Sequence, residues 1–160
     1  MSCLRTVMEK PTEDLAIALE SEVLGEAFFR SAYYVTFFGD RRNKVKILWW
    51  LETQTKKRIL EYFEVNSIKV PKSRRTVVKG SILGVFCSVA PWNIILQEIL
   101  KETECYLEVF CRLKEQAAEK DQELFEYIVA HEAAIRQFVE IELVNDGNNS
   151  LEPIEALLND

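Results

Sequence analysis

The sequence predicts an all-α protein, and three observations support this prediction. Apolar residues recur every three or four positions through four long segments, which is the period of a helix buried on one side. No segment of useful length alternates strictly between apolar and polar residues, as a half-exposed strand would. The links between the four segments are short, long and short in turn. We therefore expect a four-helix bundle.

The first two helices are expected at residues 12–38 and 44–65. Thr12, followed by two acids, is a typical helix cap, and Gly39 with Asp40 is a typical helix end.

The last two helices are expected at residues 92–119 and 122–144. Pro91 stands where a first-turn proline is tolerated, and the run Asp146 to Asn149 should end the last helix. The C-terminal tail, residues 145–160, should contain a short helix or turn that lies back on the bundle.

The links determine the expected topology. A short link forces two helices to be antiparallel neighbours, whereas a long link lets the chain cross the bundle. Residues 39–43 and 120–121 are short links, and residues 66–91 form a crossover between helices 2 and 3. We expect two antiparallel hairpins within one domain, residues 1–160.

Composition excludes several classes of protein. With 48% hydrophobic residues the chain can bury a core, so disordered and low-complexity classes are excluded. A net charge of −6 argues against a nucleic-acid partner, which needs a surplus of Lys and Arg. Four cysteines without Cys-x-x-Cys spacing, after an N-terminus unlike a secretory signal, predict a reducing, cytoplasmic location.

Acidic residues lie in the middle of the apolar stripes of all four helices. At 100° per residue each falls in or near the buried line of its helix. They are Glu22 or Glu26 on the first helix, then Glu52, Glu102 and Glu132 on the others. Both hairpins place the second acid 30 residues after the first if Glu22 is used, so a pseudo-twofold arrangement would bring all four to one depth.

Four buried carboxylates need a compensating charge, since desolvation and mutual repulsion would otherwise protonate them. Two divalent metal ions would neutralise them, and oxygen ligands suit iron, manganese or magnesium. The alternative is that no metal binds and that Arg30, Lys56 or Arg136 pairs with the acids.

With these residues the chain resembles the ferritin-like superfamily of four-helix carboxylate bundles. In that family a Glu on helices 1 and 3 joins Glu-x-x-His on helices 2 and 4 to hold two metal ions. The segment LESEVLGEAFF is similar to the first-helix pattern and contains Glu22 and Glu26, and Glu102 is the counterpart on helix 3. The resemblance implies an iron or manganese cofactor and redox or oxygen-dependent chemistry on a small molecule.

The chain departs from the family at both imidazole positions. Glu52 and Glu132 are followed three residues later by Thr55 and Ile135 instead of His. The single histidine, His131, lies on the flank of its stripe, about 100° from Glu132, and could approach a core site only from the side. We expect a degenerate site lined also by Tyr106, Thr55 and His131. The sequence does not decide whether the protein is an enzyme.

The crossover joins a basic run to an uncharged one. Lys69, Lys72, Arg74, Arg75 and Lys79 precede seventeen uncharged residues, 80–96, which are too few to span a bilayer. Residues 69–96 could form a peripheral contact with an anionic membrane. The interpretation we favour here is that the crossover packs across the bundle.

Large apolar residues also exceed what one core needs. Residues 47–51, together with a second apolar face on helix 1 (Ile17, Leu24, Phe28, Val35), predict a homodimer, unless the crossover or the tail covers them. The alternative function is therefore a metal-free bundle, expected to be a dimer, that binds a small apolar ligand or a protein partner.

Overall fold

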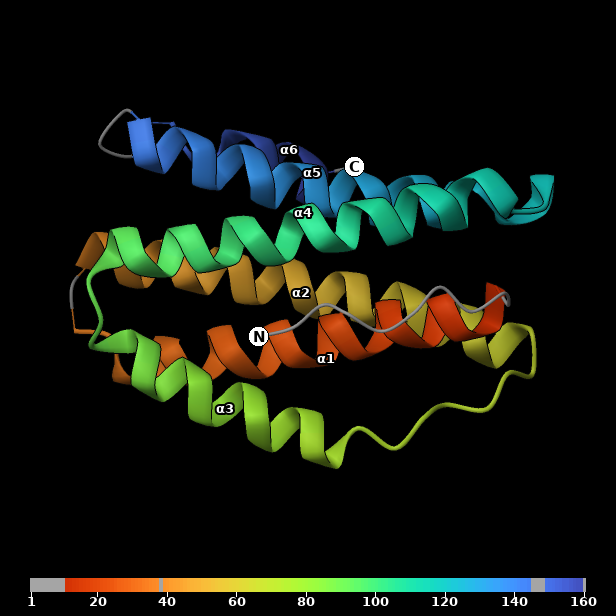
Figure 1. Cartoon of the computed structure of the whole chain (residues 1–160), viewed down its shortest axis with the longest axis horizontal. Coiled ribbons are helices and arrows are strands. Elements are labelled where there is room, and N and C mark those ends of the chain that lie inside the picture. Colours follow the sequence, from red (N-terminus) through yellow and green to blue (C-terminus); the bar gives the residue numbers. More distant parts are fainter. Residues whose placement is uncertain (1–10, 38, 145–148, 160) are drawn as a thin grey trace.

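The computed structural model describes residues 11–37, 39–144 and 149–159, of which most are helical and none is in a strand. Four long helices lie roughly along the longest axis: α1 (Pro11–Val35), α2 (Gly39–Val65), α4 (Trp92–Gln116) and α5 (Gln122–Val144) (Figure 1). Two shorter helices, α3 (Arg74–Ser88) and α6 (Glu152–Asn159), lie outside them. The all-α prediction is confirmed.

The link between α1 and α2 is placed differently from the prediction. Helix α1 ends at Val35, where the hydroxyl of Thr36 donates to the carbonyl of Ala32 at 2.7 Å. Gly39 and Asp40 begin α2 instead of ending α1. The carboxylate of Asp40 suits the first turn of a helix, and it pairs with Lys44 at 2.7 Å.

The second hairpin matches the prediction more closely. Helix α5 has the predicted bounds, whereas α4 ends at Gln116 because Ala117 is extended. A short 3-10 turn, η1 (Glu119–Asp121), joins the two helices. The tail forms α6, which packs on α5 and buries Ile154 completely, as expected. The run Asp146 to Asn149 was predicted to end this helix, but residues 145–148 lie outside the described residues.

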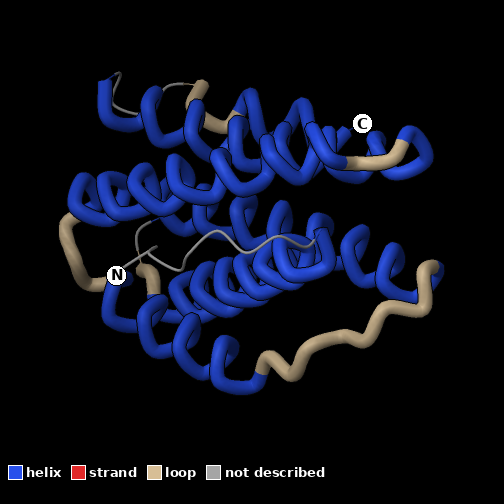
Figure 2. Tube along the Cα trace, turned by 45° about the vertical axis from the view of Figure 1, so that its right-hand side comes forward, coloured by secondary structure: helices blue, strands red, loops and turns tan. Residues whose placement is uncertain are grey.

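The crossover contains a helix that the sequence analysis missed. Helix α3 lies along the outer side of α1, away from α4 and α5 (Figures 1 and 2). Its close approach depends on two glycines: a Cβ on Gly84 would collide with the carbonyl oxygen of Phe28, and one on Gly80 would crowd that of Leu24. Arg41 holds the far end of the helix by donating to the carbonyls of Cys87 and Ala90 at 2.9 and 3.0 Å.

This arrangement answers two expectations about α1 and the crossover. The crossover packs against the bundle, as the favoured interpretation has it, but its helix α3 lies along α1. Ile95 and Leu96 are buried near the start of α4, as expected. Helix α3 also covers Leu24 and Phe28 on the second face of α1, which was the stated alternative to a dimer contact there. Every helix in the described ranges is too short or insufficiently apolar to cross a membrane.

The core forms two apolar clusters with a polar layer between them. One cluster surrounds Leu48, Leu51 and Phe138, and the other surrounds Ile59 and Phe110. On α2, α4 and α5 the residues of the two clusters are separated along the chain by a short stretch that contains polar side chains, and on α1 the polar side chain of Glu22 lies at the edge of the second cluster, beside Val23. That layer holds the candidate site.

Candidate metal centre

Every long helix contributes a glutamate to the lining of a single cavity of about 270 Å³, and α4 contributes Glu98 in addition to Glu102. Glu22, Glu52 and Glu132 are buried, with 1%, 5% and 4% of their surface exposed, and Glu102 is half-buried. The four acids predicted from the apolar stripes are thus brought to one place.

Glu26, the other candidate on α1, lies outside this group. Its carboxylate accepts hydrogen bonds from the ammonium of Lys56 and, at 3.2 Å, from the hydroxyl of Thr53. The choice between the two acids of α1 is therefore resolved: Glu22 faces the cavity and Glu26 forms an ion pair beside it.

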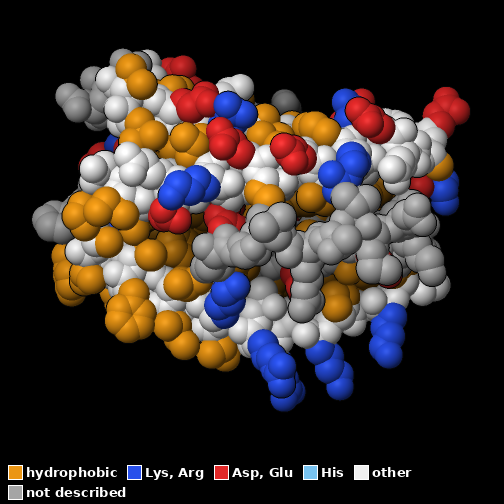
Figure 3. All heavy atoms as spheres, viewed as in Figure 1, with side chains coloured by type: hydrophobic (Ala, Val, Ile, Leu, Met, Phe, Trp, Pro, Cys, Tyr) orange, Lys and Arg blue, Asp and Glu red, His pale blue; other side chains and the backbone are white. Residues whose placement is uncertain are grey.

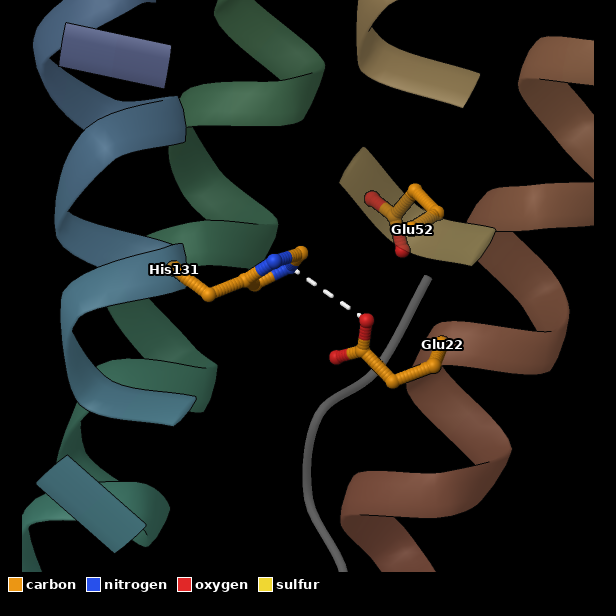
Figure 4. A group of neighbouring side chains, drawn as sticks. All are labelled: Glu22, Glu52 and His131. Carbon is orange, nitrogen blue, oxygen red and sulfur yellow. Dashed lines mark ion pairs between the residues drawn. The ribbon is translucent and has the colours of Figure 1, made fainter. Parts of the chain in front are cut away.

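His131 approaches the buried acids from α5. Its Nδ1 lies 2.8 Å from Oγ1 of Thr55, and its Nε2 lies 3.4 Å from Oε2 of Glu22 (Figure 4). The Thr55 hydroxyl has one proton and lies 3.1 Å from the carbonyl oxygen of Leu51. When the hydroxyl donates to Leu51, Nδ1 carries the ring proton and the lone pair of Nε2 points toward Glu22.

Glu22, Glu52 and His131 form a compact set of potential ligands. One ligand atom from each of the three lies within 4.8 Å of the others. Figure 4 shows the three side chains projecting toward one another from α1, α2 and α5. Ligand atoms this close together could hold one metal ion.

Burial and repulsion keep these groups near neutrality. Desolvation, followed by the charges of Glu52 and Glu132, holds the pKa of Glu22 well above its usual range. Desolvation also raises the pKa of Glu52 to about 8, although its hydrogen bond with Glu22 opposes the shift. The pKa of Glu132 is raised by burial and by Glu52 and Glu102, and burial lowers the pKa of His131 to about 3.

The three buried acids lack a compensating cation. Among the described residues, no Lys or Arg forms an ion pair with Glu22, Glu52 or Glu132. Of the cations expected to neutralise them, Lys56 pairs with Glu26, Arg136 pairs with Glu140 and Glu104, and Arg30 is exposed. One buried oxygen of Glu22 and one of Glu132 have no hydrogen-bond partner.

Gly25 makes room for the carboxylate of Glu52. A Cβ at this position would collide with both oxygens of that carboxylate. A side chain on α1 would thus displace the acid of α2, which lies against the bare backbone of the neighbouring helix.

The rest of the cavity wall is mainly apolar. It is formed by side chains of α1, α3, α4 and α5, including Phe28, Leu83, Ile99 and Ile135. Tyr106 also lines the cavity, and desolvation, then the charges of the four acids, raises its pKa to about 12. Thr55 and His131, expected on the wall, lie behind it and contact each other.

The position of His131 could not be predicted from one stripe. Helix α5 contacts α2, α4 and α6, so it is buried over a wide arc. His131 on the flank consequently faces α2 while Glu132 faces the cavity. Thr55 was the one indication of this contact in the sequence. It occupies the position of an imidazole in the ferritin-like pattern, and the imidazole of His131, from α5, contacts it.

Comparison of the chain with known protein families, with curated proteins and with solved structures finds no significant match.

Proposed function

We propose that this protein is a ferritin-like bundle with a degenerate metal centre that carries out redox or oxygen-dependent chemistry on a small apolar molecule. The observation that carries the proposal is the convergence of Glu22, Glu52 and His131, with Glu132 on the same cavity. None of these acids pairs with a Lys or Arg in the part of the chain that the structure describes.

The donor set fits iron or manganese. Carboxylate oxygens with one imidazole suit both metals, and the unpartnered oxygens of Glu22 and Glu132 are free to coordinate. Thr55 supports His131 as an outer-shell partner commonly supports a ligating imidazole, by fixing the ring and its tautomer. With one imidazole in place of two, we expect weaker binding than in a complete Glu-x-x-His pair of motifs.

The residues around the centre define what it would accept. Bound iron or manganese would supply electron exchange with dioxygen or with a reducible substrate. The apolar wall fits a small apolar molecule, and the neutral hydroxyl of Tyr106 offers a hydrogen bond at the acid-lined end.

Anaerobic titration with Fe(II), followed by elemental analysis of the desalted protein, tests the proposal. We expect the wild-type chain to retain iron, and Glu52→Gln to lower its affinity at least tenfold, because an amide is a poorer ligand than a carboxylate. Glu26→Gln is the matched control, since Glu26 lies one turn along α1 but pairs with Lys56.

Two outcomes would count against a metal centre. One is wild-type protein that takes up neither Fe(II) nor Mn(II). The other is equal loss of binding in Glu52→Gln and Glu26→Gln, which would indicate nonspecific binding to acidic surface.

A second candidate function is metal-free binding of an apolar ligand. The raised pKa values of Glu22, Glu52 and Glu132 favour it, because protonated acids need no cation to remain buried. In that case chelator-treated protein would bind a fluorescent apolar probe, Ile99→Trp would block the cavity, and added Fe(II) would change neither result.

A further inference from the structure

The outer face of α3, extended by Val89 directly after its last residue, carries a continuous group of exposed apolar side chains. At 100° per residue, five positions fall within an arc of about 100°. They are Val78, Ile82, Val85, Phe86 and Val89, and each has between 46% and 85% of its surface exposed. We call these five residues the α3 apolar face. The opposite side of the helix holds Gly80 and Gly84 against α1.

Cations adjoin this face on the N-terminal side. Lys69, Lys72, Arg74, Arg75 and Lys79 are all exposed, and the sequence contains no acid between Glu64 and Glu98. Figure 3 shows Lys and Arg side chains projecting from the lower edge of the molecule, beside a field of apolar atoms. The rest of the chain is strongly acidic, because the whole carries a net charge of −6.

We propose that the α3 apolar face and the five adjoining cations dock the protein on an anionic lipid surface. The C-terminal half of α3 enters the interface between headgroups and acyl chains, and the cations contact the headgroups. The chain therefore lies on the membrane without crossing it.

Charge and shape favour a lipid surface over other occupants. Each Lys or Arg near an anionic membrane strengthens the binding, and apolar side chains buried in the interface add to it. An overall acidic protein would otherwise be repelled by such a membrane, so a local group of five cations with no acid among them is needed for approach.

Docking at this face would also place the lipid against a helix that borders the cavity. Leu83 and Cys87, on the inner side of α3, line the cavity. An apolar molecule dissolved in the membrane would then lie close to the helix that borders the cavity. This step rests on the proposed function, but the docking itself does not, since it involves none of the buried acids.

Flotation of the full chain with vesicles tests the docking. We expect the protein to float with vesicles of phosphatidylcholine and phosphatidylserine, and to bind at least tenfold less to phosphatidylcholine alone. High salt should weaken binding, because it screens the cations. The double variant Phe86→Ser with Val89→Ser should lose at least tenfold in affinity, and Arg75→Gln with Lys79→Gln should reduce the preference for phosphatidylserine.

The matched control is Trp50→Ser with Val65→Ser. These two residues are 56% and 82% exposed, close to the 69% and 85% of Phe86 and Val89, but they lie on α2. Equal loss in both double variants would overturn the proposal, as would wild-type protein that stays unbound with phosphatidylserine present. A dimer that the α3 variant converts to monomer, without vesicle binding, would assign the face to a second copy and also overturn it.

Discussion

At the scale of single residues, the environment of each glutamate decides its role. Glu22 and Glu26 are one helical turn apart and have the same side chain, yet one is buried in the cavity and the other pairs with Lys56. Sequence periodicity found both but could not separate them, because the difference depends on which face of α2 lies opposite.

The buried acids make metal-free protein less stable as the pH rises. The native pKa of Glu52 is about 8, above the ordinary value of 4.5, so between these values the unfolded chain loses a proton that the native chain keeps. In that window each such carboxyl lowers the free energy of unfolding by about 1.4 kcal/mol per pH unit, or roughly 3 to 6 °C in melting temperature. Glu22 and Glu132 act in the same direction.

Thermal melts in chelator from pH 5 to pH 8 measure this effect. His131 has the opposite effect below pH 6.5, because there the unfolded chain binds a proton that the buried ring of the native protein does not. The fall in melting temperature should therefore be clearest above pH 6.5. Glu52→Gln should flatten the profile, whereas Glu20→Gln, which removes an exposed acid of α1, should leave it unchanged. A melting temperature that rises between pH 6.5 and pH 8 would contradict the raised pKa values.

At the scale of elements, backbone contact between α1 and α3 is a point of sensitivity. Gly84→Ala would force a methyl group against the carbonyl of Phe28 and separate the helices, at a cost of about 1–3 kcal/mol. Urea unfolding would measure the loss. Gly39→Ala is the control, since a Cβ there meets no neighbouring atom. Unchanged stability in Gly84→Ala would show that α3 is not held closely.

The four long helices were predictable because each buries one apolar stripe over six or more turns. Helix α3 was not, because it buries glycines and exposes valines and a phenylalanine, the reverse of the usual pattern. The same periodicity located the acids, because each of them interrupts an otherwise apolar stripe. The contribution of His131 depends on how α5 packs against three other helices. The periodicity of α5 alone carries no information about that packing.

At the scale of the whole molecule, a buried ion pair joins the two hairpins near one end of the bundle. Lys44 of α2 lies 2.8 Å from Glu142 of α5, and both side chains are less than 10% exposed. Glu142 also accepts a hydrogen bond from the indole of Trp92 at 2.7 Å. This group ties α2, α4 and α5 together.

Lys44→Met should destabilise the protein by about 3–5 kcal/mol, because it leaves the buried carboxylate of Glu142 without its cation. Lys57→Met is the control, since Lys57 forms an exposed pair with Glu61 that contributes little. Equilibrium unfolding in urea compares the two. Losses of similar size would show that Glu142 is hydrated in solution.

The hydrogen bond between Glu22 and Glu52 has a consequence for any ion that enters the bundle. A carboxylic acid must deprotonate before it can ligate, so each cation that binds would expel H⁺ into the solvent. Loading would acidify an unbuffered solution, and affinity would climb with alkalinity until the interior acids were fully ionised. A pH electrode in the titration vessel would register the exchange directly.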